Sequence, residues 1–276
     1  MSLPNSQTRA IDRLVSYIES ATRDFIQETG LVMMFFADST RAMFRRPSRY
    51  LEIIRHMEFV GNQSIMIISL TGAFTGLALS LQIYLGFKMV NATNLVGPIV
   101  SLGITRELGP VLTGLIVAAR AGGAMAARLG TMRVNEQIDA LDVMGIHTKQ
   151  YLIAPRIVAS VICMPLLCAV FDFVAMVGAW FLCVKVVSLD EAIFFDKVNS
   201  TLEIRHINEG LFKAAVFGLI FSLICCYRGY NTKGGAKGVG EATNQGVVRS
   251  MVLIIIFDYF LTTFLRVFQA MLGITM

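Results

Sequence analysis

Five long stretches of the chain are dominated by apolar residues and carry few charges. A helix needs about 20 mainly apolar residues to cross the hydrocarbon core of a bilayer. The stretches that reach or approach this length are 64–87, 98–127, 157–187, 211–227 and 247–272. We therefore predict an all-α integral membrane protein with about five transmembrane helices.

The region before the first stretch has a different pattern. Apolar residues, among them Ile11, Leu14 and Ile18, recur there at helical spacing with charged residues between them. This pattern is typical of an amphipathic helix in the membrane interface. We expect residues 1–60 to form cytoplasmic, interfacial helices and residues 61–276 to form the transmembrane domain. A soluble helical hairpin packed on a partner is the alternative for the first region.

Basic residues are distributed unevenly between the two ends of the predicted spans. Eight precede the first span, and 128–156 and 228–249 carry four each, whereas the opposite connections carry only Lys88, Lys185, Lys197 and Arg205. Because basic residues gather on the cytoplasmic side, we predict a cytoplasmic N-terminus and a C-terminus on the other side. The net charge of +5 then fits anionic lipid headgroups better than nucleic acid.

The composition agrees with a membrane protein, and the motifs offer no catalytic site. Hydrophobic residues make up 55% of the chain and charged residues 16%, far from the balance of a soluble domain. The glycine-rich segment 229–241 does not fit the phosphate-binding pattern G-x-x-x-x-G-K-[ST]. We therefore expect no ATPase activity, no catalytic residue, no metal site and no cofactor bound by this chain.

Charged side chains occur inside the predicted spans, where they are costly and usually functional. They are Arg106, Glu107, Asp172, Lys213 and Asp258. They could line a polar cavity, or pair with one another and fix helix packing. Neighbouring helical positions point about 100° apart, so at least one of Arg106 and Glu107 should reach a different helix or the cavity. A third possibility is a relay of carboxylates in an ion- or proton-coupled secondary transporter.

A short acidic segment, 133–145, separates the second and third spans. Apolar residues at helical spacing and the acidic residues Glu136, Asp139 and Asp142 predict an amphipathic helix that ends at Gly145. Such a helix could dock into a groove on a partner protein. A solvated connector without a partner is the alternative.

The same part of the chain carries a family resemblance. Residues 105–145, TRELGPVLTGLIVAARAGGAMAARLGTMRVNEQIDALDVMG, contain the combination R-E-L-G-P, A-R-A-G and E-Q-I-D-A-L-x-V-M-G. This combination resembles the MlaE/YrbE permease family, the membrane subunits of ABC systems that work with MCE proteins. The similarity continues through 69–85, 151–159 and 257–265.

The resemblance implies an assembly in the bacterial inner membrane. Family members have five spans after an interfacial helix and form a symmetric dimer. Each copy carries a cytoplasmic ATPase subunit, which binds ATP and Mg. A periplasmic MCE-domain protein sits opposite, and some systems add a STAS-domain protein. The complex moves phospholipid or related lipid between inner and outer membranes and so bears on outer-membrane lipid asymmetry.

The resemblance also assigns roles to residues. The acidic helix becomes the ATPase-coupling element, with Glu136, Gln137, Asp139, Ala140 and Leu141. The lipid cavity would be lined by Leu81, Gln82, Tyr84, Leu102, Arg106 and Glu107. Lys213 and Asp258 match polar positions of the later spans and form the expected structural polar pair.

Overall fold

The computed structural model describes residue 27 and residues 30–41 and 50–271. Every regular element in this part of the chain is a helix, which confirms the predicted all-α class. The elements are α2 (Tyr50–Val60), α3 (Asn62–Lys88), η1 (Thr93–Leu95), α4 (Val96–Gly103), η2 (Ile104–Leu108), α5 (Gly109–Val117), η3 (Ala118–Gly122), α6 (Gly123–Val134), α7 (Gln137–Val143), η4 (Lys149–Ile153), α8 (Ala154–Trp180), η5 (Phe181–Val186), α9 (Glu191–Thr201), α10 (Ile204–Tyr230) and α11 (Gly235–Met271).

Five helical segments in the described residues are long and apolar enough to cross a membrane, as predicted. They are Tyr50–Lys88, Thr93–Val134, Lys149–Val186, Ile204–Tyr230 and Gly235–Met271. Each begins before the expected apolar stretch, because the helices continue into their more polar ends. Helix α2 gives way to α3 at Gly61, within the first spanning segment, and the expected domain boundary at residue 60 stays a prediction.

The second span is assembled from six consecutive helical pieces, η1 to α6, rather than one regular helix. Two of them, η2 and η3, are single π-helical turns. Such turns are frequent at functional sites. The first π-turn holds Arg106 and Glu107 and the second holds Arg120, so both interruptions coincide with charged side chains.

Helix α8 is central to the bundle and packs closely against α3. The buried residues of α3 recur every four positions and are mostly small: Ser64, Ile68, Gly72, Gly76 and Ser80. A Cβ added at Gly76 would overlap the carbonyl group of Ala175 on α8. The two backbones therefore approach as closely as small residues allow, which is how membrane helices gain packing energy.

The helical residues 30–41 lie at the same end of the molecule as α7. Phe35 is buried, with its ring centroid 5.5 Å from that of Tyr227. Asp38 pairs with Lys149 at 2.7 Å, and this hydrogen-bonded ammonium lowers the pKa of the Asp38 carboxyl. The rest of the expected interfacial region, apart from α2 and residue 27, falls outside the described residues.

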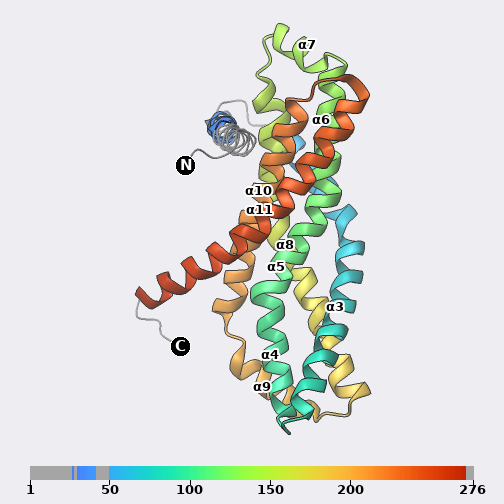
Figure 1. Cartoon of the computed structure of the whole chain (residues 1–276), viewed down its shortest axis with the longest axis vertical. Helices are drawn as coiled ribbons and strands as arrows, with labels where there is room; N and C mark the ends of the chain where they lie inside the picture. The colour runs from blue at the N-terminus through green and yellow to red at the C-terminus, as the bar shows by residue number, and fades with distance from the viewer. Residues whose placement is uncertain (1–26, 28–29, 42–49, 272–276) are drawn as a thin grey trace, which may run out of the picture.

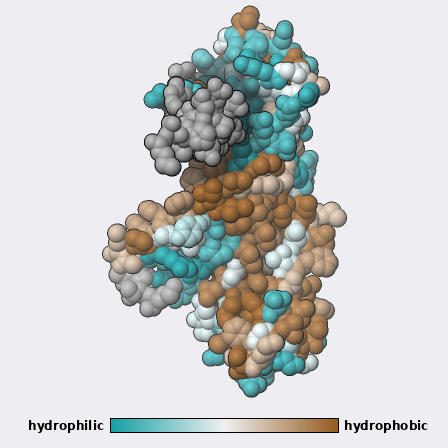
Figure 2. All heavy atoms as spheres, in the orientation of Figure 1, coloured by the Kyte–Doolittle hydropathy of each residue, from teal (hydrophilic) through white to brown (hydrophobic). Residues whose placement is uncertain are grey.

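The last helix, α11, separates from the bundle along its length. Its first half packs on α10 and α6, whereas its second half projects away from the other helices in Figure 1. Large apolar side chains are exposed there, including Tyr259, Phe260, Phe264 and Phe268. Figure 2 shows hydrophobic residues over the lower and middle parts of the molecule and hydrophilic residues around α7. Helix α7 therefore stands outside the apolar belt.

Candidate functional site

A cluster of polar side chains joins the second, fourth and fifth spans around Lys213. The ammonium of Lys213, on α10, lies 2.9 Å from Glu107 Oε2 on η2 and 3.1 Å from Asp258 Oδ1 on α11. It also donates to Thr262 Oγ1 at 2.6 Å and to the Arg106 carbonyl oxygen at 2.9 Å. The Lys213 side chain is only 2% exposed, so its charge depends on these partners.

The local sequence explains why the Arg106 carbonyl needs a donor from another helix. In an α-helix that carbonyl would accept a bond from the N–H four residues later, but that residue is Pro110, which has no N–H. The preceding amide, of Gly109, bonds to the Ile104 carbonyl across the π-turn. Lys213 thus satisfies a backbone acceptor that the proline leaves open in a setting without water.

A second ion pair lies beside this cluster. Arg106 Nη2 is 3.2 Å from Glu209 Oε2 on α10, and Gln269 of α11 donates to the other oxygen of Glu209. Both charged residues of η2 therefore reach α10, and Glu107 also accepts from Thr262 of α11. The π-turn and the lengths of the side chains let adjacent residues reach one helix.

The structure brings the expected polar pair together and adds residues that sequence reasoning missed. Lys213 and Asp258 are in direct contact, with Glu107 as a third member. Glu209, Thr262 and Gln269 were not singled out. Glu209 lies four positions before Lys213, and Thr262 lies four after Asp258, so helical spacing from the predicted residues was the signal that could have found Glu209 and Thr262.

The other residues expected at a lipid cavity lie on an open surface of the single chain. Leu81 and Gln82 are exposed on α3, and Leu102 is half-buried on α4. Tyr84 is half-buried, with Lys88 Nζ 5.7 Å from its ring centroid. Glu107, whose side chain is 40% exposed, is the most accessible of the ionised groups bonded to Lys213.

Asp172, the remaining charged residue, lies apart from the Lys213 cluster. It is buried on α8, and within the described residues its Oδ1 has no hydrogen-bond partner. A Cβ at Gly109 would overlap that oxygen, so glycine at this position makes room for the carboxyl group. Its other oxygen, Oδ2, is 3.7 Å from the sulfur of Cys168.

The acidic segment between the second and third spans forms a helix shorter than its pattern suggested. Arg133 and Val134 belong to α6, and the chain turns at Glu136, which has a φ of 57°. Helix α7 then runs over Gln137–Val143. Hydrogen bonds from Gly145 N to Asp142 O and from Ile146 N to Leu141 O close its C-terminus, with Gly145 at a φ of 74°.

Helix α7 is anchored on one side and open on the other. Ile138 is fully buried, and Arg133 of α6 pairs with Asp139 at 2.5 Å. Leu141 is half-buried, whereas Glu136, Gln137 and Ala140 are exposed. Val143 and Met144 are 89% and 65% exposed, so apolar and acidic groups share the open face. A surface of this kind, held on a rigid anchor, suits a groove on a partner protein.

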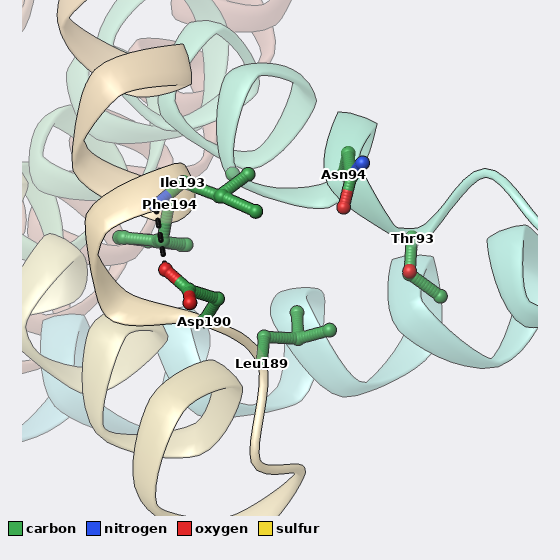
Figure 3. A pocket seen from close by; sticks show the side chains of 7 residues that line it. Thr93, Asn94, Leu189, Asp190, Ile193 and Phe194 are labelled. Atoms are coloured by element: carbon green, nitrogen blue, oxygen red, sulfur yellow. Dashed lines mark hydrogen bonds between the residues drawn. The ribbon is translucent and has the colours of Figure 1, made fainter.

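A small hollow lies at the opposite end of the bundle, between the start of the second span and α9 (Figure 3). Its lining residues are Thr93, Asn94, Gly97, Leu189, Asp190, Ile193 and Phe194. Asp190 Oδ1 accepts a bond from the Ile193 amide at 3.0 Å and thereby caps α9. The carboxylate in this hollow therefore serves as the N-cap of its own helix.

Five apolar spans and the exposed helix α7 at one end define a multi-pass membrane protein. The family model described as permease MlaE matches residues 53–264, and the chain belongs to that family. The chain is 38% identical to a probable ABC transporter permease protein of Rickettsia prowazekii over 91% of this chain and 96% of the relative. It is 31% identical to the intermembrane phospholipid transport system permease protein MlaE of Haemophilus influenzae, over 91% and 97% of the two chains.

A plant protein is also similar to this chain. The chloroplastic protein trigalactosyldiacylglycerol 1 of Arabidopsis thaliana is 38% identical over 76% of this chain and 60% of the relative. Together with the bacterial relatives, this similarity confirms the resemblance drawn from residues 105–145. The chain is therefore an ABC transporter permease.

Proposed function

We propose that the chain is the membrane subunit of an ABC system that moves phospholipid between the inner and outer membranes of a bacterium. It works as a dimer in the inner membrane, with its N-terminus cytoplasmic and its C-terminus periplasmic. A separate ATPase subunit binds ATP and Mg on the cytoplasmic side. The name of the Haemophilus relative, an intermembrane phospholipid transport protein, supports the substrate class.

The open face of α7 is the observation that carries this proposal. Glu136, Gln137 and Ala140 are exposed, and Asp139 is held by Arg133, so the ATPase contacts a preformed surface. Helix α6 follows any movement of α7, because Ile138 is buried and the two helices are in contact. Helix α6 in turn packs on α10 and α11. Nucleotide binding therefore biases the arrangement of three spans.

Lipid would enter a cavity that the chain encloses together with a second copy, with exposed Leu81 and Gln82 and half-buried Tyr84 and Leu102 in its wall. The Arg106 guanidinium attracts the phosphate of the headgroup in competition with Glu209. A periplasmic MCE-domain protein receives or delivers lipid at the far end, and a STAS-domain protein joins the ATPase in some systems.

The competing proposal is a secondary transporter that relays protons through Glu107, Asp172 and Asp258. Two of these carboxylates share Lys213, but the third lies on α8 with no bond to that cluster. A continuous relay would need Asp172 to reach the others. The geometry of the polar groups thus favours the ABC proposal.

Purification of the tagged chain in mild detergent tests the proposal. Wild type should bring down a P-loop ATPase and an MCE-domain protein, and the complex should hydrolyse ATP. Glu136→Lys should lose the ATPase, because the variant places a cation on the acidic docking face. Lysine, like glutamate, is a non-glycine residue, so the substitution does not change the backbone strain at the positive φ of position 136. Lys237→Glu, a charge reversal at an exposed site outside α7, is the matched control and should keep the ATPase. A wild-type complex without an ATPase would contradict the proposal.

A further inference from the structure

Three arginines surround the end of α2 at the same end of the bundle as α7. Arg120 comes from η3, Arg128 from α6 and Arg156 from α8. The guanidinium carbons of Arg120 and Arg128 lie 5.1 Å and 4.5 Å from the ring centroid of Phe59. Arg120 is further satisfied by bonds to the Phe59 carbonyl oxygen and to Ser64 Oγ. Among the described residues, no comparable set of hydrogen bonds surrounds Arg128 or Arg156.

Arg156 is the most unusual member of the group. It is only 6% exposed, and within the described residues its Nη1 has no hydrogen-bond partner. The groups that face it are Glu52 of α2, Arg128 of α6 and Cys226 of α10. The Glu52 carboxylate is bonded to Arg55 at 3.0 Å. Arg128 and Arg156 also both interact electrostatically with His56 of α2.

This arrangement concentrates positive charge without a matching anion. In the described part of the chain, neither Arg128 nor Arg156 lies within 4.0 Å of a carboxylate oxygen. A buried charge is costly unless it is paired and hydrogen-bonded. Phosphate is the anion that best fits the planar, many-donor guanidinium group.

The surroundings of the cluster indicate where such a phosphate comes from. Helix α2 exposes Tyr50, Leu51 and Ile54, with 70%, 73% and 60% of their surfaces accessible. These side chains offer an apolar surface to acyl chains on the helix whose other face meets the arginines. Basic pockets between spanning helices at a membrane surface are a known setting for anionic headgroups.

We propose that Arg128 and Arg156, with His56 beside them, bind the phosphate of an anionic phospholipid at the α7 end of the bundle. The site goes beyond the proposed function, because it lies on a different set of helices from the Lys213 cluster and needs no ATPase to be filled. The lipid supplies the negative charge that the buried guanidinium lacks and ties α2 to α6 and α8.

Native mass spectrometry of the full chain released from lipid nanodiscs tests the site. The nanodiscs contain equal amounts of phosphatidylglycerol and phosphatidylcholine, with and without excess inorganic phosphate. Wild type should retain phosphatidylglycerol in preference. The preference should fall about tenfold in Arg128→Gln and in Arg156→Gln, as expected for a lost charge-assisted contact. Arg156→Lys should keep part of it. Arg133→Gln, an arginine at the same end that pairs with Asp139, should match wild type.

Each outcome decides the proposal. Equal retention of phosphatidylglycerol by wild type and both glutamine variants overturns it. Binding of inorganic phosphate with no preference between the two lipids also overturns it, since the occupant is then a free anion. If Arg156→Gln does not fold, the exposed Arg128 still provides the test. If the chain keeps the lipid preference but recruits no ATPase, the result supports this site and contradicts the proposed function.

Discussion

At the scale of single residues, Lys213 has more hydrogen-bond acceptors around its ammonium group than it has N–H donors. An ammonium has three N–H donors, yet four acceptors lie within hydrogen-bond distance of Nζ: two carboxylates, a hydroxyl and a backbone carbonyl. At least one bond is therefore shared or exchanged. Glu107 is the partner with the greatest exposure and so has the most freedom to leave.

Replacement of Lys213 should destabilise the protein strongly. Lys213→Met leaves two carboxylates facing each other and the Arg106 carbonyl without a donor. Loss of one partner from a buried ion pair typically costs about 3–5 kcal/mol in the free energy of unfolding. A thermal melt in detergent should show a large fall in Tm. The exposed Lys237→Met serves as control, and the triple variant with Glu107→Gln and Asp258→Asn should recover part of the loss. An unchanged Tm in Lys213→Met contradicts the role assigned to the cluster.

Arg106 offers a test of lipid contact that is separate from assembly. Arg106→Ala should lower lipid transfer between vesicles by about tenfold, the effect of losing one charge-assisted contact with phosphate. Co-purification of the ATPase should not change, because Arg106 lies in the first half of the second span, whereas α7 follows the end of that span. Arg106→Lys should transfer more lipid than Arg106→Ala. Transfer at the wild-type rate in the alanine variant would remove Arg106 from the mechanism.

The residue types at membrane depth could be predicted from sequence, but their pairing could not. The cost of burying charge marks Arg106, Glu107, Lys213 and Asp258 as important in any helix. Their partners depend on the π-turn at Ile104–Leu108, which changes the directions of successive side chains. No periodicity in an apolar run reveals such a turn. Sequence reasoning therefore left both a polar cavity and a structural cluster open.

At the scale of elements, the contact between α3 and α8 depends on glycine. Gly76→Ala should push the helices apart, because the new methyl group overlaps the backbone of Ala175. We expect a loss of a few kcal/mol in unfolding free energy, seen as a lower Tm. Gly86→Ala on the same helix meets nothing within 4 Å and should be neutral or stabilising, since alanine favours helix by about 1 kcal/mol. Equal effects of the two variants would contradict this packing.

The sequence predicted that a helix exists at α7, but it placed the start of that helix too early. Val134 and Ile138 have the spacing of one continuous helix, which extended the prediction back to residue 133. The structure interrupts that helix at Glu136, a non-glycine residue with positive φ. Residues other than glycine reach this conformation only when their surroundings impose it, so local pattern gives little warning. The C-terminal end was predicted at Gly145 because a glycine there has a known local role.

At the scale of the whole molecule, the five spans follow from hydropathy but the path of α11 does not. Its apolar residues predict a membrane helix equally well whether it packs in the bundle or beside it. In the structure its second half leaves Phe260, Phe264 and Phe268 exposed. The exposed surface is available to lipid or to a second copy of the chain.

Orientation in the membrane can be tested with single cysteines in a background without native cysteines. The five native cysteines are buried, so their replacement by small residues is feasible. Lys237→Cys should react with a membrane-impermeant maleimide only from the cytoplasmic side. Lys197→Cys on α9 should react only from the opposite side. The reverse labelling pattern would contradict the orientation inferred from the distribution of basic residues.

The bond from Lys213 to the Arg106 carbonyl constrains how the spans can move. The fourth span supplies the donor for one backbone carbonyl of the second span. Sliding one span past the other would therefore leave that carbonyl without a hydrogen bond inside the membrane. These two spans should therefore travel as one rigid unit. The second half of helix α11 is bonded to them through side chains, at Asp258, Thr262 and Gln269. Displacement of this half would break side-chain bonds and leave the backbones of the second and fourth spans intact, so we expect it to be the part that moves.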